Sequence, residues 1–133
     1  MKYLVLLFCM SSLVVSAQTK RDYMDAMSRY VTFYNNDQMD SICAMFPKRQ
    51  SGKFDCFWAQ VQSSRRSLDE YGRITSYKYI GLDTSDLEPV RVFRVVFAKK
   101  GVKATSFTLH DDLKFGTFRF DTSSDEIERM LNR

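Results

Sequence analysis

The chain has 133 residues, 44% of them hydrophobic, and its 20 basic and 16 acidic side chains leave a formal net charge of +4. This length suits one domain, and the 11 Phe and 7 Tyr residues supply material for a sizeable core. The small basic excess is spread out, in groups such as Lys99, Lys100 and Lys103, without a base-stacking motif. We therefore interpret these lysines as solvated turn residues and exclude nucleic acid as a partner.

Residues 1–17 have the pattern of a secretory signal peptide. Lys2 supplies a positive charge, an apolar run follows, and Ala17 ends a cleavage context before the polar Gln18. The alternative is an N-terminal membrane anchor, but the run is shorter than the roughly 20 residues that a spanning helix needs. We expect cleavage after Ala17, export to the periplasm or the cell exterior, and one soluble domain over residues 18–133.

Three amphipathic helices are expected in the first half of the mature chain. The first covers residues 21–34, with an apolar stripe at spacings of four, three and four formed by Tyr23, Met27, Tyr30 and Tyr34. A second helix begins near Met39 and stops at Pro47, and the polar residues before it offer a cap. The third has the strongest periodicity, with Trp58 as its core anchor and Gly72 as its C-terminal stop.

The mature chain keeps two cysteines, Cys43 and Cys56. Export implies an oxidising compartment, so we expect a disulfide between them, with two free thiols as the alternative. The bond requires Asp55 to cap the third helix, because a helix that already runs through Cys56 would turn its side chain away from the apolar stripe. With no Cys-x-x-Cys pair and one His, we expect no metal and no cofactor.

The stretch 89–120 predicts an antiparallel meander, since β-branched and aromatic residues alternate with polar ones between short turn-like breaks. Its expected inner positions are Phe93, Val95, Phe97, Phe107, Leu109, Phe118 and Phe120. An earlier strand, 73–82, makes the sheet four-stranded, and its parity leaves the inner face open. After residue 120, Ser123 or Ser124 caps a last helical turn. Helices packed on one face of such a sheet make an α+β fold.

The outer face of the expected sheet is unusually apolar. If Phe93 and its neighbours face the helices, then Val92, Val96 and Ala98 lie outside, around Arg94. Contiguous apolar patches often mark contact sites. We therefore expect weak homodimerisation, or a protein partner, at this face.

The order of elements resembles that of the nuclear-transport-factor-two-like, or cystatin-like, superfamily, in particular its small exported bacterial members of unknown function. The segments that carry the resemblance are 33–37, 45–47, Trp58, 71–72 and 116–120. The resemblance implies three N-terminal helices on a sheet that curls into a cone, open at one end. Such cones host isomerases, dehydratases, hydrolases and members without known catalysis, so the fold cannot choose among them.

His110 has the greatest chemical potential in this chain. With Asp111 and Asp112 it is either a metal or acid–base group or a polar hairpin turn, and we favour the turn. Cone enzymes of the isomerase or dehydratase kind resemble one another in placing acids on inward strand positions, and the strands predicted in this chain contain no interior acid.

The candidate ligand-binding residues are Tyr30, Tyr34, Arg94 and Phe118. The tyrosines either line a pocket as its polar contacts or are core aromatics with wet hydroxyls. Arg94 either faces solvent on the outer sheet surface or points into the cone as an anion contact. We expect an exported, non-enzymatic module that binds a small apolar ligand or a protein partner through the cone or the outer sheet face. The alternative is a small cone enzyme that uses His110 or a pocket tyrosine.

Overall fold

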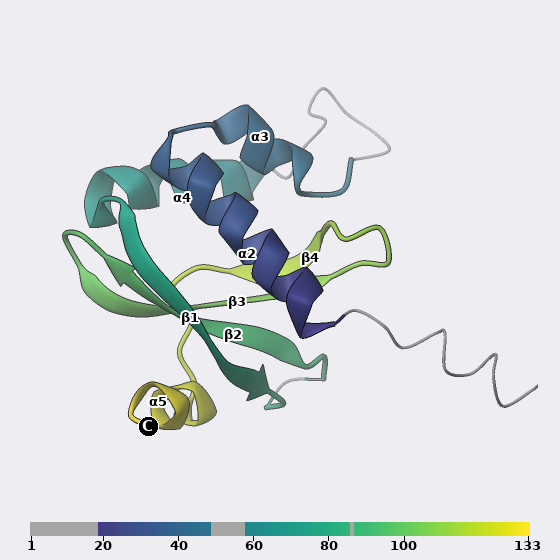
Figure 1. Ribbon diagram of the computed structural model, residues 1–133, viewed down its shortest axis with the longest axis vertical. Helices are drawn as coiled ribbons and strands as arrows, with labels where there is room; N and C mark the ends of the chain where they lie inside the picture. Colours follow the sequence, from purple (N-terminus) through teal and green to yellow (C-terminus); the bar gives the residue numbers. More distant parts are fainter. Residues whose placement is uncertain (1–18, 49–57, 86) are drawn as a thin grey trace, which may run out of the picture.

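The computed structural model describes residues 19–48, 58–85 and 87–133, with 58–60 as backbone only. Within these ranges the protein has an α+β fold, and its strands form one open antiparallel sheet in the order β1-β2-β3-β4. Figure 1 shows helices α2, α3 and α4 on one side of the sheet and α5 on the other. The predicted α+β class and antiparallel meander are confirmed. The predicted signal peptide lies outside the described residues.

Helix α2 (Lys20–Asn35) starts with a capping box. The Thr19 hydroxyl accepts the backbone N–H of Asp22, and the Asp22 carboxylate accepts the N–H of Thr19. At the other end, the Asn35 side chain hydrogen-bonds both the N–H and the carbonyl of Ile74, which ties α2 to the start of the sheet. The predicted apolar stripe is confirmed, because its four members are all buried: Tyr23, Met27, Tyr30 and Tyr34.

Helices α3 (Met39–Ala44) and α4 (Trp58–Tyr71) pack near the C-terminal end of α2 (Figure 1). The predicted polar cap of α3 is wrong, since its N-cap residue Gln38 makes no side-chain cap bond. Asp37 instead adopts a φ of 54°, a left-handed turn conformation that Asp tolerates. Gly72, at a φ of 77°, ends α4 as predicted. None of the helices in the described ranges is long and apolar enough to cross a bilayer.

Four strands make up the sheet: β1 (Ile74–Asp83), β2 (Val90–Phe97), β3 (Gly101–Leu109) and β4 (Phe115–Arg119). The inner face of β1, which parity left open, follows from two register irregularities, between Ile74 and Ser76 and between Tyr79 and Gly81. An extra residue at a bulge reverses the alternation of side chains. Ile74 and Tyr79 therefore both pack against the inner core, although one number is even and the other odd.

The inner face of the sheet and helices α2 to α4 enclose one aromatic core. Phe107 lies near its middle and is fully buried. Its ring centroid is 5.5 Å from that of Tyr23, 5.4 Å from Phe93 and 4.9 Å from Phe115. The predicted inner set of the meander is confirmed, since all its members pack in this cluster or against it: Phe93, Val95, Phe97, Phe107, Leu109, Phe118 and Phe120.

The outer face carries helix α5 (Asp125–Leu131), which begins at the predicted cap Ser124. Its residue Ile127 is fully buried in a small cluster with Val90, Val92 and Ala104. Val92 thus lies on the outer face as expected, but it is covered by α5 and is not exposed to solvent. Part of the expected apolar patch is therefore used within the chain, and homodimerisation through the rest of this face stays a prediction.

Candidate ligand-binding site

Three of the four candidate ligand-binding residues lie together in the aromatic core. Tyr30 and Tyr34 are fully buried, and the ring centroids of Tyr30 and Phe118 are 4.8 Å apart. The Tyr30 hydroxyl lies 2.7 Å from Oγ of Ser64, and the Tyr34 hydroxyl donates to the carbonyl of Gly72 at 3.1 Å. Both hydroxyls therefore hold α2 against α4 and the residue that follows it.

Burial raises the pKa of both tyrosines far above the ordinary value. For Tyr30, burial outweighs the lowering effect of the hydrogen bond with Ser64. For Tyr34, burial is reinforced by Tyr71 and by the charge of Asp69. Both phenols stay protonated at physiological pH, so they act as neutral hydrogen-bonding groups within the core.

The fourth candidate, Arg94, lies on the other side of the sheet. In the β2–β3 register it stands opposite Ala104, a member of the outer cluster beneath α5. The inner-face arginine of β2 is Arg91, which shares the parity of Phe93 and stands opposite Phe107. An inward cation was expected as one possibility for this strand, and the structure supplies it from Arg91.

Three residues lie around this guanidinium, and with Arg91 they are called the Arg91 cluster: Lys20, Tyr23, Tyr79 and Arg91. Nη1 of Arg91 donates to the Tyr79 hydroxyl at 2.7 Å. The guanidinium carbon lies 5.1 Å from the Tyr23 ring centroid and 5.9 Å from that of Tyr79. Nζ of Lys20 lies 5.4 Å from the same Tyr79 centroid. Two cations thus share one tyrosine through cation–π contacts.

The Arg91 cluster can be reached from solvent. Lys20 is exposed, Tyr79 and Arg91 are half-buried, and Tyr23 has 8% of its surface exposed to solvent. The hydrogen bond with Tyr79 raises the pKa of Arg91 and outweighs the opposing effect of burial. The guanidinium is therefore permanently charged, at the end of the inner face where α2 begins.

Part of this cluster could have been found from the sequence. The inner set that contains Phe93 and Val95 also places Arg91 inward, because the three residues share parity. Tyr79 could not be assigned to a face without the irregularity between Ile74 and Ser76, which places Tyr79 on the same face as Ile74. The approach of Lys20 depends on how α2 lies across the sheet, which no local pattern predicts.

The segment around His110 forms a tight turn between β3 and β4. The His110 N–H donates to the Lys114 carbonyl, and the His110 carbonyl accepts the N–H of Leu113, both at 2.8 Å. The Asp112 carboxylate accepts the Lys114 N–H at 3.1 Å. These bonds agree with the interpretation of the segment as a polar turn. In the part of the chain that the structure describes, no three His, Cys, Asp or Glu side chains are grouped closely enough to hold a metal ion.

Asp83, the last residue of β1, is a buried carboxylate. It accepts the N–H of Ser85 at 2.9 Å, the Ser85 hydroxyl at 2.6 Å and the Ser124 hydroxyl at 3.2 Å. Burial alone would raise the pKa of Asp83, but the hydrogen bonds from Ser85 and Ser124 to the carboxylate outweigh burial and lower it. The ionised carboxylate therefore joins the end of β1 to the start of α5.

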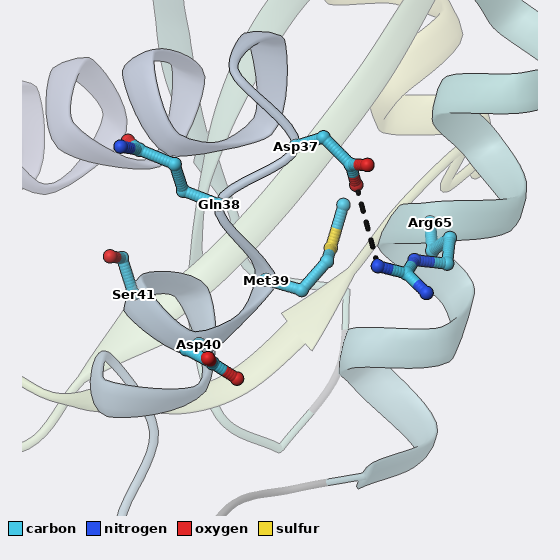
Figure 2. A pocket seen from close by; sticks show the side chains of 6 residues that line it. All are labelled: Asp37, Gln38, Met39, Asp40, Ser41 and Arg65. Atoms are coloured by element: carbon cyan, nitrogen blue, oxygen red, sulfur yellow. Dashed lines mark ion pairs between the residues drawn. The ribbon is translucent and has the colours of Figure 1, made fainter.

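A surface hollow of about 280 Å³ lies at the junction of α2, α3 and α4 (Figure 2). Asp37 and Arg65 approach each other across it, with Oδ1 and Nη2 3.7 Å apart. Both side chains are more than half exposed, at 58% and 63%, so this ion pair contributes little to stability. The other residues around the hollow come from one short segment: Gln38, Met39, Asp40 and Ser41.

Lys99 and Lys100 lie in the β2–β3 turn, as interpreted, whereas Lys103 lies within β3. All three have partners within the chain. Lys99 donates to the Asp69 carbonyl at 3.1 Å. Lys100 and Lys103 form ion pairs with Glu70 at 3.9 Å and Asp121 at 3.6 Å.

Cys43 of α3 is disulfide-bonded. Its expected partner Cys56 lies outside the described residues, as does the expected cap Asp55. The pairing of Cys43 with Cys56 therefore stays a prediction.

In comparisons with known proteins, no family model matches the sequence, and no curated protein matches it significantly. The resemblance to the nuclear-transport-factor-two-like superfamily stays a prediction.

Proposed function

We propose that this protein is an exported, non-enzymatic binding module whose ligand contacts the Arg91 cluster. The observation that carries the proposal is the place of Arg91 on the inner face of β2. The inner positions that follow it, Phe93, Val95 and Phe97, are apolar and at most 2% exposed. A half-buried guanidinium in this row loses hydration, and an apolar side chain would avoid that cost. Ligand binding accounts for a charged side chain at this position.

The partners of the other reactive side chains support binding over catalysis. The Tyr30 and Tyr34 hydroxyls are bonded to protein groups inside the core, and the Asp83 carboxylate is bonded to serines beside α5. An acid–base residue must instead reach the proton that it transfers. We further propose that the sheet curls around α2 as a cone, with the Arg91 cluster at its open end.

Amide-resolved NMR of ¹⁵N-labelled mature protein tests the proposal. Four groups of small molecules would be added separately: carboxylates, phosphate monoesters, amines and uncharged aromatics. The proposal predicts that at least one group shifts the amides of Tyr23, Tyr79 and Arg91 in a saturable manner, with those of Arg94 unchanged. If no group produces saturable shifts, or if they centre on another surface, this binding site is wrong.

Export is tested by the intact mass of the protein recovered from outside the cytoplasm. We expect a chain that begins at Gln18, because Ala17 ends the cleavage context. A product that retains residues 1–17 would contradict export by this route.

A further inference from the structure

We infer that the ligand of the Arg91 cluster carries an oxyanion, a carboxylate or a phosphate, which binds between Arg91 and Lys20. This inference rests on the proposed function and specifies the chemical class of its ligand. It follows from the charge balance of the cluster and from the hydrogen-bonding capacity left on the guanidinium.

The two cations of the cluster are balanced by no carboxylate in the part of the chain that the structure describes. The ion pairs found among the described residues involve other cations: Arg65, Lys100 and Lys103. The described acids near Arg91 in sequence or register have other positions, and Asp86 lies outside the described residues. Asp22 closes the cap of α2, Asp83 is bonded to Ser85 and Ser124, and Glu88 lines a hollow with Thr117 and Arg119.

The geometry of the guanidinium favours an oxyanion over other ligands. Arginine presents five N–H donors in a planar fork that matches the two oxygens of a carboxylate or phosphate. Nη1 donates to the Tyr79 hydroxyl, and the guanidinium also hydrogen-bonds the Tyr23 side chain. These bonds fix the plane of the fork and leave its other N–H donors for a ligand. Nζ of Lys20 lies over the same ring, so it can approach the anion from a second direction.

The tyrosines contribute mainly by orientation. The cations lie near the Tyr23 and Tyr79 rings, at 5.1 to 5.9 Å from the centroids. A ligand that relied on stacking would compete with these contacts, whereas an anion adds to them. A cationic or neutral ligand would leave the charge of the cluster unbalanced.

Calorimetric titration at constant ionic strength tests the inference with two probes, inorganic phosphate and benzoate. Chloride from the background salt serves as the non-specific anion. We expect at least one probe to bind saturably to wild type, and Arg91→Gln to weaken it roughly tenfold or more, as loss of a charge-assisted bond implies. Arg94→Gln is the matched control, because it removes the same charge from the same strand on the opposite face. It should change affinity by less than about twofold.

Further variants keep the test informative if Arg91→Gln loses its fold. Arg91→Lys retains the charge without the fork and should weaken binding by a smaller factor. Tyr79→Phe removes the hydroxyl that orients Arg91 and should also weaken it. Binding of phosphate alone identifies a phosphorylated ligand, and binding of benzoate alone a carboxylate.

Two results would overturn the inference in distinguishable ways. If neither probe binds but an amine or an uncharged aromatic shifts the amides of the Arg91 cluster, the oxyanion class is wrong and the binding module stands. If neither probe binds and no small molecule shifts those amides, both proposals fail. Equal weakening by Arg91→Gln and Arg94→Gln would also contradict the inference, because it would indicate general charge attraction.

Discussion

The layer between helix α2 and the inner face of the sheet contains tyrosines in two contrasting environments, one at each end of the helix. At the C-terminal end, Tyr30 and Tyr34 are fully buried, and their hydroxyls meet neutral protein groups. At the N-terminal end, Tyr23 and Tyr79 lie beside cations and near solvent, and the Tyr79 hydroxyl accepts from Arg91. The first group is satisfied within the fold, whereas the second retains a positive charge that no described carboxylate balances.

This difference shows why residue type alone does not predict a role. Tyr23, Tyr30 and Tyr34 belong to one helical stripe and look equivalent in the sequence. The strand and helix that face each of them decide whether its hydroxyl stabilises the core or orients a charged neighbour. A binding role is therefore expected where the opposing side chain is Arg91, and a structural role where it is Ser64.

The largest effect is expected from removing the ring that connects the two ends. Phe107→Ala should lower the free energy of unfolding by about 3–5 kcal/mol, because a fully buried ring is lost and a cavity remains. Urea unfolding followed by tyrosine fluorescence measures the change. Val102→Ala, at a 43% exposed position on the same strand, is the control and should stay within about 0.5 kcal/mol. A loss below about 1 kcal/mol for Phe107→Ala would mean that the two ends do not share a core.

A smaller effect is expected on the opposite face of the sheet. Ile127→Ala should cost about 2–3 kcal/mol, since Ile127 is fully buried but belongs to a helix of only seven residues that can adjust. Oxyanion binding by Arg91 should be unchanged, because α5 lies on the other face. Glu128→Ala, exposed on the same helix, serves as the control. Unchanged stability of Ile127→Ala would show that α5 does not dock as described.

The buried hydroxyl near the C-terminal end of α2 is tested by Tyr30→Phe. The change leaves the buried Ser64 hydroxyl without its partner and should cost about 1–2 kcal/mol. The double variant Tyr30→Phe/Ser64→Ala should recover part of this loss in a double-mutant cycle. Tyr79→Phe, the same change near the N-terminal end of α2, should cost less, because Tyr79 is half-buried and water can reach the site. The reverse order of the two costs would contradict the distinction between the ends.

The smallest effect is expected on the pH dependence of stability. It concerns Asp83, which lies beside the start of α5 and not at either end of α2. The pKa of Asp83 is lowered by folding, so its contribution to stability is present above the unfolded value of about 3.9 and is lost as pH falls through the folded pKa. Asp83→Asn should cost about 1 kcal/mol at neutral pH. The difference between wild type and variant should shrink as pH falls below about 4, as measured by thermal unfolding. A constant difference down to pH 2 would contradict the lowered pKa.

Much of the fold could be predicted because its signals are local. The stripe of α2, the stop at Gly72, the inner set of the meander and the Ser124 cap all follow from spacing or from single capping residues. The face of β1 could not be predicted, since two register irregularities break its alternation. The docking of α5 over Val92 was also missed, because a short helix does not specify its partner.

The candidate site was predicted only in part. An inward arginine on β2 was considered, but at Arg94, because the alternation was not followed back to Arg91. Tyr30 and Tyr34 were recognised on the correct face, yet their partners lie 34 and 38 residues away in sequence, so their structural role needed the fold. The meeting of Lys20 and Arg91 over Tyr79 joins three separate elements and has no sequence signal.

The most direct test of the central claim compares Arg91 and Arg94 within one sample. Side-chain Nε–Hε signals of both arginines would be followed by two-dimensional ¹H–¹⁵N NMR while phosphate or benzoate is added at constant ionic strength. The signal of Arg91 is predicted to shift saturably with at least one probe, and that of Arg94 to stay in place. Parallel shifts of both signals, or a saturable shift of Arg94 alone, would contradict a binding site at the Arg91 cluster.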